Sequence, residues 1–111
     1  MSSAPQAIRH QRDFAALSAS RDRGRSGPIR VVRAPDAPDG GVAVAYALGR
    51  SVGSAVVRNR IRRRLRVLMR ERLHADVLVG GRYLVSVSPA GANATYDELG
   101  RHLDAALAQL S

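Results

Sequence analysis

Apolar residues recur along the middle of the chain with the spacing of one face of an α-helix. At about 100° per residue, four of them fall on one side: Val57, Ile61, Leu65 and Leu68. Ser54 stands just before this segment, where its hydroxyl can accept from the first free backbone N–H groups. The pattern therefore predicts a helix over residues 55–73 that packs one face on a core.

Shorter patterns predict the other elements. Runs of β-branched and apolar residues indicate three strands, over residues 29–33, 42–48 and 82–88. A short helix is expected over residues 11–18. Thr95 and Glu98 have the spacing of a capping box, which predicts a C-terminal helix with one leucine stripe. That stripe consists of Leu99, Leu103, Leu107 and Leu110.

The remaining segments are expected to connect these elements. Residues 18–28 are rich in Ser, Gly and Arg and are predicted to be a loop. Residues 34–41 hold two prolines and paired glycines, which favours a hairpin connection between the flanking strands. The order of elements predicts an α+β fold, a small mixed sheet with helices packed against it. The 111 residues should form one domain, 1–111, with residues 1–8 as a flexible tail.

Charge is concentrated on the predicted central helix. Residues 50–72 contain nine of the eighteen arginines and a single acid, Glu71, so they carry +8 of the net charge of +9. Four arginines follow one another at spacing four and should face away from the apolar stripe: Arg58, Arg62, Arg66 and Arg70. We call them the arginine ladder; Asn59 and Arg63 lie beside it. Like charges at this spacing repel by roughly 0.2–0.5 kcal/mol per pair. We therefore interpret the ladder as a surface that binds an external polyanion, and not as a charged face that contacts only solvent.

Composition and spacing exclude several classes of function. The longest strongly apolar run, residues 42–49, is far shorter than the roughly 20 residues of a membrane-spanning helix, and the N-terminus does not resemble a signal peptide. The chain has no cysteine, which fits a cytoplasmic location. The three histidines lack metal-site spacing, the acids do not cluster, and no glycine-rich phosphate loop is present. We expect neither a metal site nor a catalytic site made by protein side chains alone.

The central block VVRNRIRRRLR, residues 56–66, resembles the signature of the bacterial ribonuclease P protein subunit. Supporting segments lie in the order that this family has. Before the block come RDF, two strands and a Gly-Arg-Ser-Val-Gly-Ser segment; after it come a strand ending at a proline and a helix beginning TYDEL. The similarity covers about residues 8–110. It implies a βαβ connection through the arginine helix that is left-handed, an exception to the usual crossover rule.

The resemblance also implies a function. The family's protein is a cofactor of a catalytic RNA, which uses magnesium to remove the 5′ leader of precursor tRNA. The expected partners are therefore ribonuclease P RNA and precursor tRNA, with no membrane and no obligate protein partner. Carried over to this chain, the residues that would bind the catalytic RNA are Arg58, Asn59, Arg60, Arg62, Arg63, Arg66 and Arg70. Those assigned to a cleft for the single-stranded leader are Arg9, Arg12, Phe14, Arg50 and Ser51.

Ser18 stands where the family often has a second aromatic residue in the cleft, so the leader contacts differ here in that respect. Two other classes of function are weighed. A general basic nucleic-acid binder of ribosomal or nucleoid type would share the charge and its salt dependence, but has no reason to carry the VVRNR block. A protein-only nuclease is disfavoured because no carboxylate cluster is present.

Overall fold

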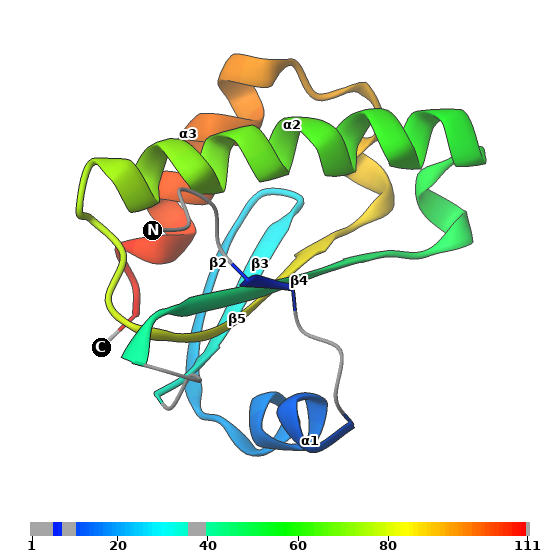
Figure 1. The fold of residues 1–111 in the computed structure, drawn as a ribbon. Helices are drawn as coiled ribbons and strands as arrows, with labels where there is room; N and C mark the ends of the chain where they lie inside the picture. Colours follow the sequence, from blue (N-terminus) through cyan, green and yellow to red (C-terminus); the bar gives the residue numbers. More distant parts are fainter. Residues whose placement is uncertain (1–5, 8–10, 36–39, 111) are drawn as a thin grey trace.

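A computed structural model describes residues 6–7, 11–35 and 40–110, with side chains from residue 15 onward. Within these residues, three α-helices and five strands follow one another (Figure 1). The helices are α1 (Gln11–Ala19), α2 (Ala55–His74) and α3 (Tyr96–Leu107). The strands are β1 (Gln6–Ala7), β2 (Asp22–Ser26), β3 (Ile29–Ala34), β4 (Val42–Leu48) and β5 (Gly81–Val87). Two 3₁₀ turns, Arg50–Val52 and Pro89–Asn93, precede α2 and α3.

The strands form one mixed sheet in the order β1-β4-β5-β3-β2. Strands β4 and β5 are parallel neighbours joined through α2, so the βαβ unit implied by the resemblance is present. Strand β3 is antiparallel to both β5 and β2. The expectation of an α+β fold with a small mixed sheet is confirmed. Strand β1 pairs with β4 and falls within the segment expected to be a flexible tail; the rest of that segment lies outside the described residues.

The two faces of the sheet are covered differently. Helices α2 and α3 lie on one face and α1 on the other (Figure 1). The main core lies under α2 and α3, where Leu65, Leu103 and Tyr83 are almost completely buried. A smaller cluster lies under α1 and joins Leu17 to Val32 and Leu84. Because side chains alternate along β3 and β5, each strand contributes to both clusters.

The predicted loop over residues 18–28 is wrong in its second half, which forms strand β2. Its sequence, DRGRS, has no β-branched residue, so local propensity does not indicate a strand. Pairing with β3 along its whole length and packing against α3 stabilise it instead. A Cβ atom at Gly24 would lie 1.9 Å from the carbonyl oxygen of Ala106, so only glycine allows α3 to approach this closely.

The predicted hairpin across residues 34–41 is also wrong. Strand β5 lies between β3 and β4, so these two strands are not neighbours in the sheet. The tight hairpin is instead formed by β2 and β3, where Gly27 has φ +53°, a value that favours glycine. Residues 36–39 lie outside the described part of the chain. Strands β3 and β4 are consecutive in the sequence but not neighbours in the sheet, because the chain continues from β4 through α2 and then places β5 between them.

Both long helices begin as the sequence predicts. The Ser54 hydroxyl accepts from the N–H of Val57 at 3.3 Å, and α2 ends at His74, one residue beyond the expected end. The capping box of α3 is complete, since Thr95 and Glu98 each accept from the other's backbone N–H. Hydrogen bonds that the Glu98 carboxylate accepts from Thr95, chiefly from its backbone N–H, lower the pKa of Glu98.

Candidate nucleic-acid interface

The apolar stripe of α2 faces the core as expected. Ile61, Leu65 and Leu68 are at most 3% exposed, and Val57 is half-buried at the N-terminal end of the stripe. Burying side chains of this size stabilises the fold by roughly 1.5–3 kcal/mol each. The helix is therefore fixed on the body of the molecule by one side, and this fixes the directions of its arginines.

The arginine ladder does not point uniformly away from the core. Arg66 and Arg70 are exposed, whereas Arg58 and Arg62 are half-buried. The expectation that Arg58 faces away from the stripe is wrong, because it lies next to Val57 and Ile61 on the helical surface. Its Nε is shielded from solvent and has no hydrogen bond. Arg62 donates to the Oδ1 of Asn59 at 2.8 Å, which orients both side chains at the helix surface.

No described acid forms a salt bridge with any of the arginines that were expected to bind catalytic RNA. Arg60 and Arg63, next to the ladder, are exposed. Glu71, the helix's own acid, accepts from the Tyr96 hydroxyl at 2.7 Å instead. Among the described residues the positive charge of this surface thus stays uncompensated, as the sequence predicted.

Arg72 shows what a compensated arginine on the same helix looks like. Its guanidinium donates to Asp104 of α3 through Nε at 2.8 Å and Nη2 at 3.0 Å. It also reaches the carbonyl oxygens of Leu68 and Gly100. Arg72 therefore joins α2 to α3 and is not a candidate for RNA binding. Its position four residues after Leu68, on the apolar side, is the sequence signal that sets it apart from the ladder.

Tyr46 is a further component of this surface. It lies on β4 under the helix, and the Arg66 guanidinium carbon is 5.9 Å from the centre of its ring. A cation over an aromatic face is stabilised by about 0.5–1 kcal/mol at an exposed site. Burial raises the pKa of Tyr46 to about 12, although the charge of Arg66 opposes the shift. Tyr46 is thus a neutral platform that restricts Arg66, a role that the sequence pattern alone does not reveal.

The residues assigned to the leader cleft are described only in part. Arg9 lies outside the described residues, and for Arg12 and Phe14 the structure describes the backbone in α1 but not the side chains. Arg50 and Ser51 are exposed in the 3₁₀ turn that directly follows β4. The structure therefore places Arg50 and Ser51 at the sheet end from which α2 departs.

Within the described residues, no group of three or more His, Cys, Asp or Glu side chains could hold a metal ion. His102 is half-buried and its Nδ1 lies 2.9 Å from the Ser26 hydroxyl, a contact that joins α3 to β2. None of the helices in this part of the chain has both the length and the apolar character needed to cross a bilayer.

Comparisons of the chain with known proteins identify its family. The family model described as Ribonuclease P matches residues 3–111. A ribonuclease P protein component from Thermobifida fusca is 40% identical over 107 residues, covering 90% of this chain and 72% of that protein. One from Acidothermus cellulolyticus is 39% identical, with coverage of 94% and 87%. A shorter match, to the Beutenbergia cavernae component, is 43% identical over 67 residues and spans 56% of that relative.

Solved structures of similar fold belong to the same family. The Staphylococcus aureus RNase P protein superposes with a TM-score of 0.77 at 16% identity, covering 88% of each chain. The Thermotoga maritima RNase P protein gives 0.75 at 17% identity, covering 88% of this chain and 91% of that one. At such low identities these structures establish the fold, while the sequence relatives establish the family.

Proposed function

The chain belongs to the ribonuclease P protein family, which gives it a role in ribonuclease P, and we propose that it binds the catalytic RNA through the exposed side of α2. The observation that carries this proposal is the uncompensated charge of the ladder beside the compensated Arg72. A guanidinium can grip a phosphate through two hydrogen bonds, and a row of them matches a folded RNA backbone. The family match does not favour the alternative of a general nucleic-acid binder without a role in tRNA processing.

In this proposal the protein contacts two RNAs. The residues that dock on the catalytic RNA are Arg58, Asn59, Arg60, Arg62, Arg63, Arg66 and Arg70. The single-stranded leader of precursor tRNA is held by Arg9, Arg12, Phe14, Arg50 and Ser51. Cleavage itself is assigned to the RNA, so the protein acts as the RNA-binding component of an endoribonuclease. We place this activity in the cytoplasm and propose no obligate protein partner.

Magnesium is assigned to the RNA and not to the protein. The described residues do not form a site that fits the ion, since their acids are engaged elsewhere or scattered. What the protein supplies is positive charge, which lowers the repulsion between RNA segments that magnesium would otherwise have to screen. The protein should therefore reduce the magnesium concentration needed for cleavage.

This proposal is tested by cleavage of precursor tRNA at low magnesium. Transcribed ribonuclease P RNA is combined with the wild-type chain, with the triple variant Arg62→Ala, Arg66→Ala, Arg70→Ala, or with no protein. We expect the wild-type chain to restore cleavage and the triple variant to need more magnesium. Arg101→Ala, on the exposed side of α3, is the control and should behave as wild type. Cleavage that is unchanged by the wild-type chain would refute the proposed function.

A further inference from the structure

The groove between α2 and α3 has a charge opposite to that of the arginine ladder. It has a volume of about 680 Å³ and is lined by the C-terminal part of α2 and by α3. Its charged lining consists of three acids and two arginines, a net charge of −1: Glu71, Asp97, Asp104, Arg72 and Arg101. We call it the acidic groove. In a chain of net charge +9, this local reversal of sign borders the most cationic helix.

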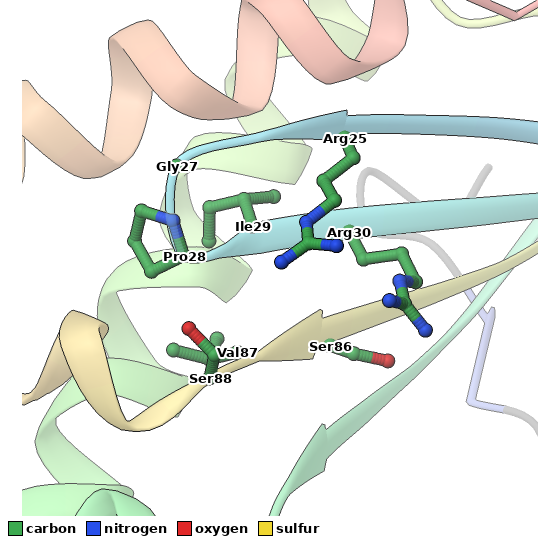
Figure 2. A pocket seen from close by; sticks show the side chains of 8 residues that line it. All are labelled: Arg25, Gly27, Pro28, Ile29, Arg30, Ser86, Val87 and Ser88. Carbon is green, nitrogen blue, oxygen red and sulfur yellow. The ribbon is translucent and has the colours of Figure 1, made fainter.

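The acids of the chain are not distributed so as to balance its arginines. Of the six acids whose side chains the structure describes, three line the acidic groove, and Glu98 directly follows one of them, Asp97. By contrast, Arg25 and Arg30 extend from the β2–β3 hairpin over a recess whose lining contains no acid (Figure 2). The ladder arginines likewise form no salt bridge within the described residues. The acids therefore gather where α2 meets α3.

Asp104 covers the one groove arginine that α2 contributes. Arg72 follows Arg70, the last residue of the ladder, by two positions. The Asp104 carboxylate accepts from its Nε at 2.8 Å and from its Nη2 at 3.0 Å. The side chain of Arg72 is 15% exposed and that of Asp104 is 61% exposed, so the carboxylate is the partner that faces solvent. A phosphate that approached Arg72 would meet a negative charge first.

Glu71 extends the negative charge to the edge of the ladder. It is exposed and directly follows Arg70. Its Oε1 accepts from the Tyr96 hydroxyl at 2.7 Å, which holds the carboxylate on the α3 side of the helix. A Cβ atom at Gly100 would lie 3.3 Å from Cδ2 of Leu68, so α3 packs closely on α2 here. Carboxylates from both helices are thus held along the same groove.

We propose that Glu71 and Asp104 are specificity-determining residues of the RNA-binding surface, because they exclude RNA from the α3 side of α2 and confine it to the ladder. This inference rests on the proposed function, since it assumes that RNA binds α2. A carboxylate placed opposite a phosphate is repelled, and interfaces use such repulsion to reject wrong arrangements. Screening limits the repulsion to about 10 Å at 0.1 M salt, so it acts only on RNA near the groove. The groove needs no ligand of its own for this role.

The repulsion should affect RNA in general more than the catalytic RNA. A helix that was cationic on both flanks could bind a duplex in several orientations, whereas a helix with one acidic flank accepts fewer. Ribonuclease P RNA docked on the ladder stays away from the groove, but an unrelated duplex can approach from any side. Removing the carboxylates should therefore strengthen binding of the unrelated duplex and reduce discrimination between the two RNAs.

The test measures the affinity of the full chain for labelled ribonuclease P RNA and for a labelled blunt RNA duplex of unrelated sequence, at several salt concentrations. In the variant Glu71→Gln, Asp104→Asn we expect affinity for the duplex to rise about fivefold, equivalent to about 1 kcal/mol. Affinity for ribonuclease P RNA should change less than about twofold. The gain should shrink as salt is raised, because the repulsion is screened.

Single substitutions provide matched controls. Asp76→Asn removes one negative charge from an exposed position outside the groove, where Asn tolerates the φ of 59°, and should leave duplex affinity unchanged. Arg72→Met with Asp104→Asn removes both charges of the ion pair and should bind the duplex as wild type does. Glu71→Gln alone keeps an acceptor for Tyr96 and tests the repulsion without altering the Arg72 pair; circular dichroism verifies that each variant is folded.

Three results would overturn the proposal. The first is an unchanged duplex affinity in folded Glu71→Gln, Asp104→Asn. The second is an equal gain in Asp76→Asn, which would show that net charge alone is responsible. The third is an equal gain for ribonuclease P RNA, which would show that the two carboxylates do not discriminate between RNAs.

Binding of ribonuclease P RNA to the triple variant Arg62→Ala, Arg66→Ala, Arg70→Ala separates this inference from the proposed function. That variant should lose affinity for the RNA. If it does while Glu71→Gln, Asp104→Asn shows no gain for the duplex, only the role of the two carboxylates is refuted. If the triple variant binds ribonuclease P RNA as tightly as wild type, the proposed function itself fails.

Discussion

Helices α2 and α3 lie on the same face of the sheet and are built alike on their inner sides, yet they differ on their outer sides. Each begins at a hydroxyl cap, Ser54 or Thr95, and each buries leucines completely in the main core. The exposed side of α3 mixes acids with Arg101, whereas the charged residues on the exposed side of α2 are arginines except for Glu71. The comparison teaches that apolar periodicity explains why both helices fold, while only the outer charge distinguishes the helix that we propose binds RNA.

The largest effects should come from the inner sides, where the two helices are equivalent. Leu65→Ala in α2 and Leu103→Ala in α3 each remove a fully buried side chain. We expect each to lower the free energy of unfolding by about 2–5 kcal/mol, through lost burial and a cavity. Urea denaturation measures the effect. A loss below 1 kcal/mol in one helix only would show that the two are not packed equivalently.

A substitution at the N-terminal cap of α3 should lower the stability of the protein without changing its affinity for RNA. Thr95→Ala removes the hydroxyl that accepts from the N–H of Glu98 at 3.1 Å. The free energy of unfolding should fall by about 1 kcal/mol, while affinity for ribonuclease P RNA stays unchanged below the unfolding temperature. Thr95→Ser, which keeps the hydroxyl, is the control. Reduced RNA affinity of folded Thr95→Ala would place α3 in the interface and break the contrast.

On the α2 side, the ring of Tyr46 should contribute to RNA binding through its contact with Arg66. Tyr46→Leu removes the platform under Arg66, and we expect RNA affinity to fall by about 0.5–1 kcal/mol. Tyr46→Phe keeps the ring and should bind like wild type. A double-mutant cycle with Arg66→Ala provides the measurement. If the effects of Tyr46→Leu and Arg66→Ala are additive, Tyr46 does not act through Arg66.

A further effect of the same residue concerns alkaline pH. The pKa of Tyr46 is about 12 in the folded protein and 10.0 without the fold. Above pH 10 the unfolded chain loses this proton first, so the stability contributed by the neutral phenol should decline between pH 10 and about 12. Tyr46→Phe should flatten this part of the stability profile, measured by denaturation at each pH. An unchanged profile would contradict the assigned burial.

Local sequence patterns were sufficient for some elements and not for others. The extent and cap of α2, the capping box of α3 and the strands β3, β4 and β5 follow from periodicity and from residues adjacent in sequence. Strand β2 does not, because DRGRS becomes a strand only through β3 and the close approach of α3. The sheet order likewise depends on where β5 inserts, which no local pattern encodes.

The candidate site shows the same division. The charge of the ladder and its place on α2 could be predicted from the residue types and their helical spacing, but the half-buried position of Arg58 could not. The partners that distinguish individual arginines could not, because Asp104 and Tyr46 come from other elements.

Directed cleavage of the bound RNA tests the central claim most directly, because it reports which side of the protein faces the RNA. The chain has no cysteine, so Arg70→Cys on α2 and Ala105→Cys on the exposed side of α3 each give a unique attachment point for an iron chelate. With ribonuclease P RNA, the chelate at position 70 should produce strong cuts at a few sites, and that at position 105 weak or no cuts. Equal cutting from both positions, or stronger cutting from α3, would contradict docking through the arginine helix.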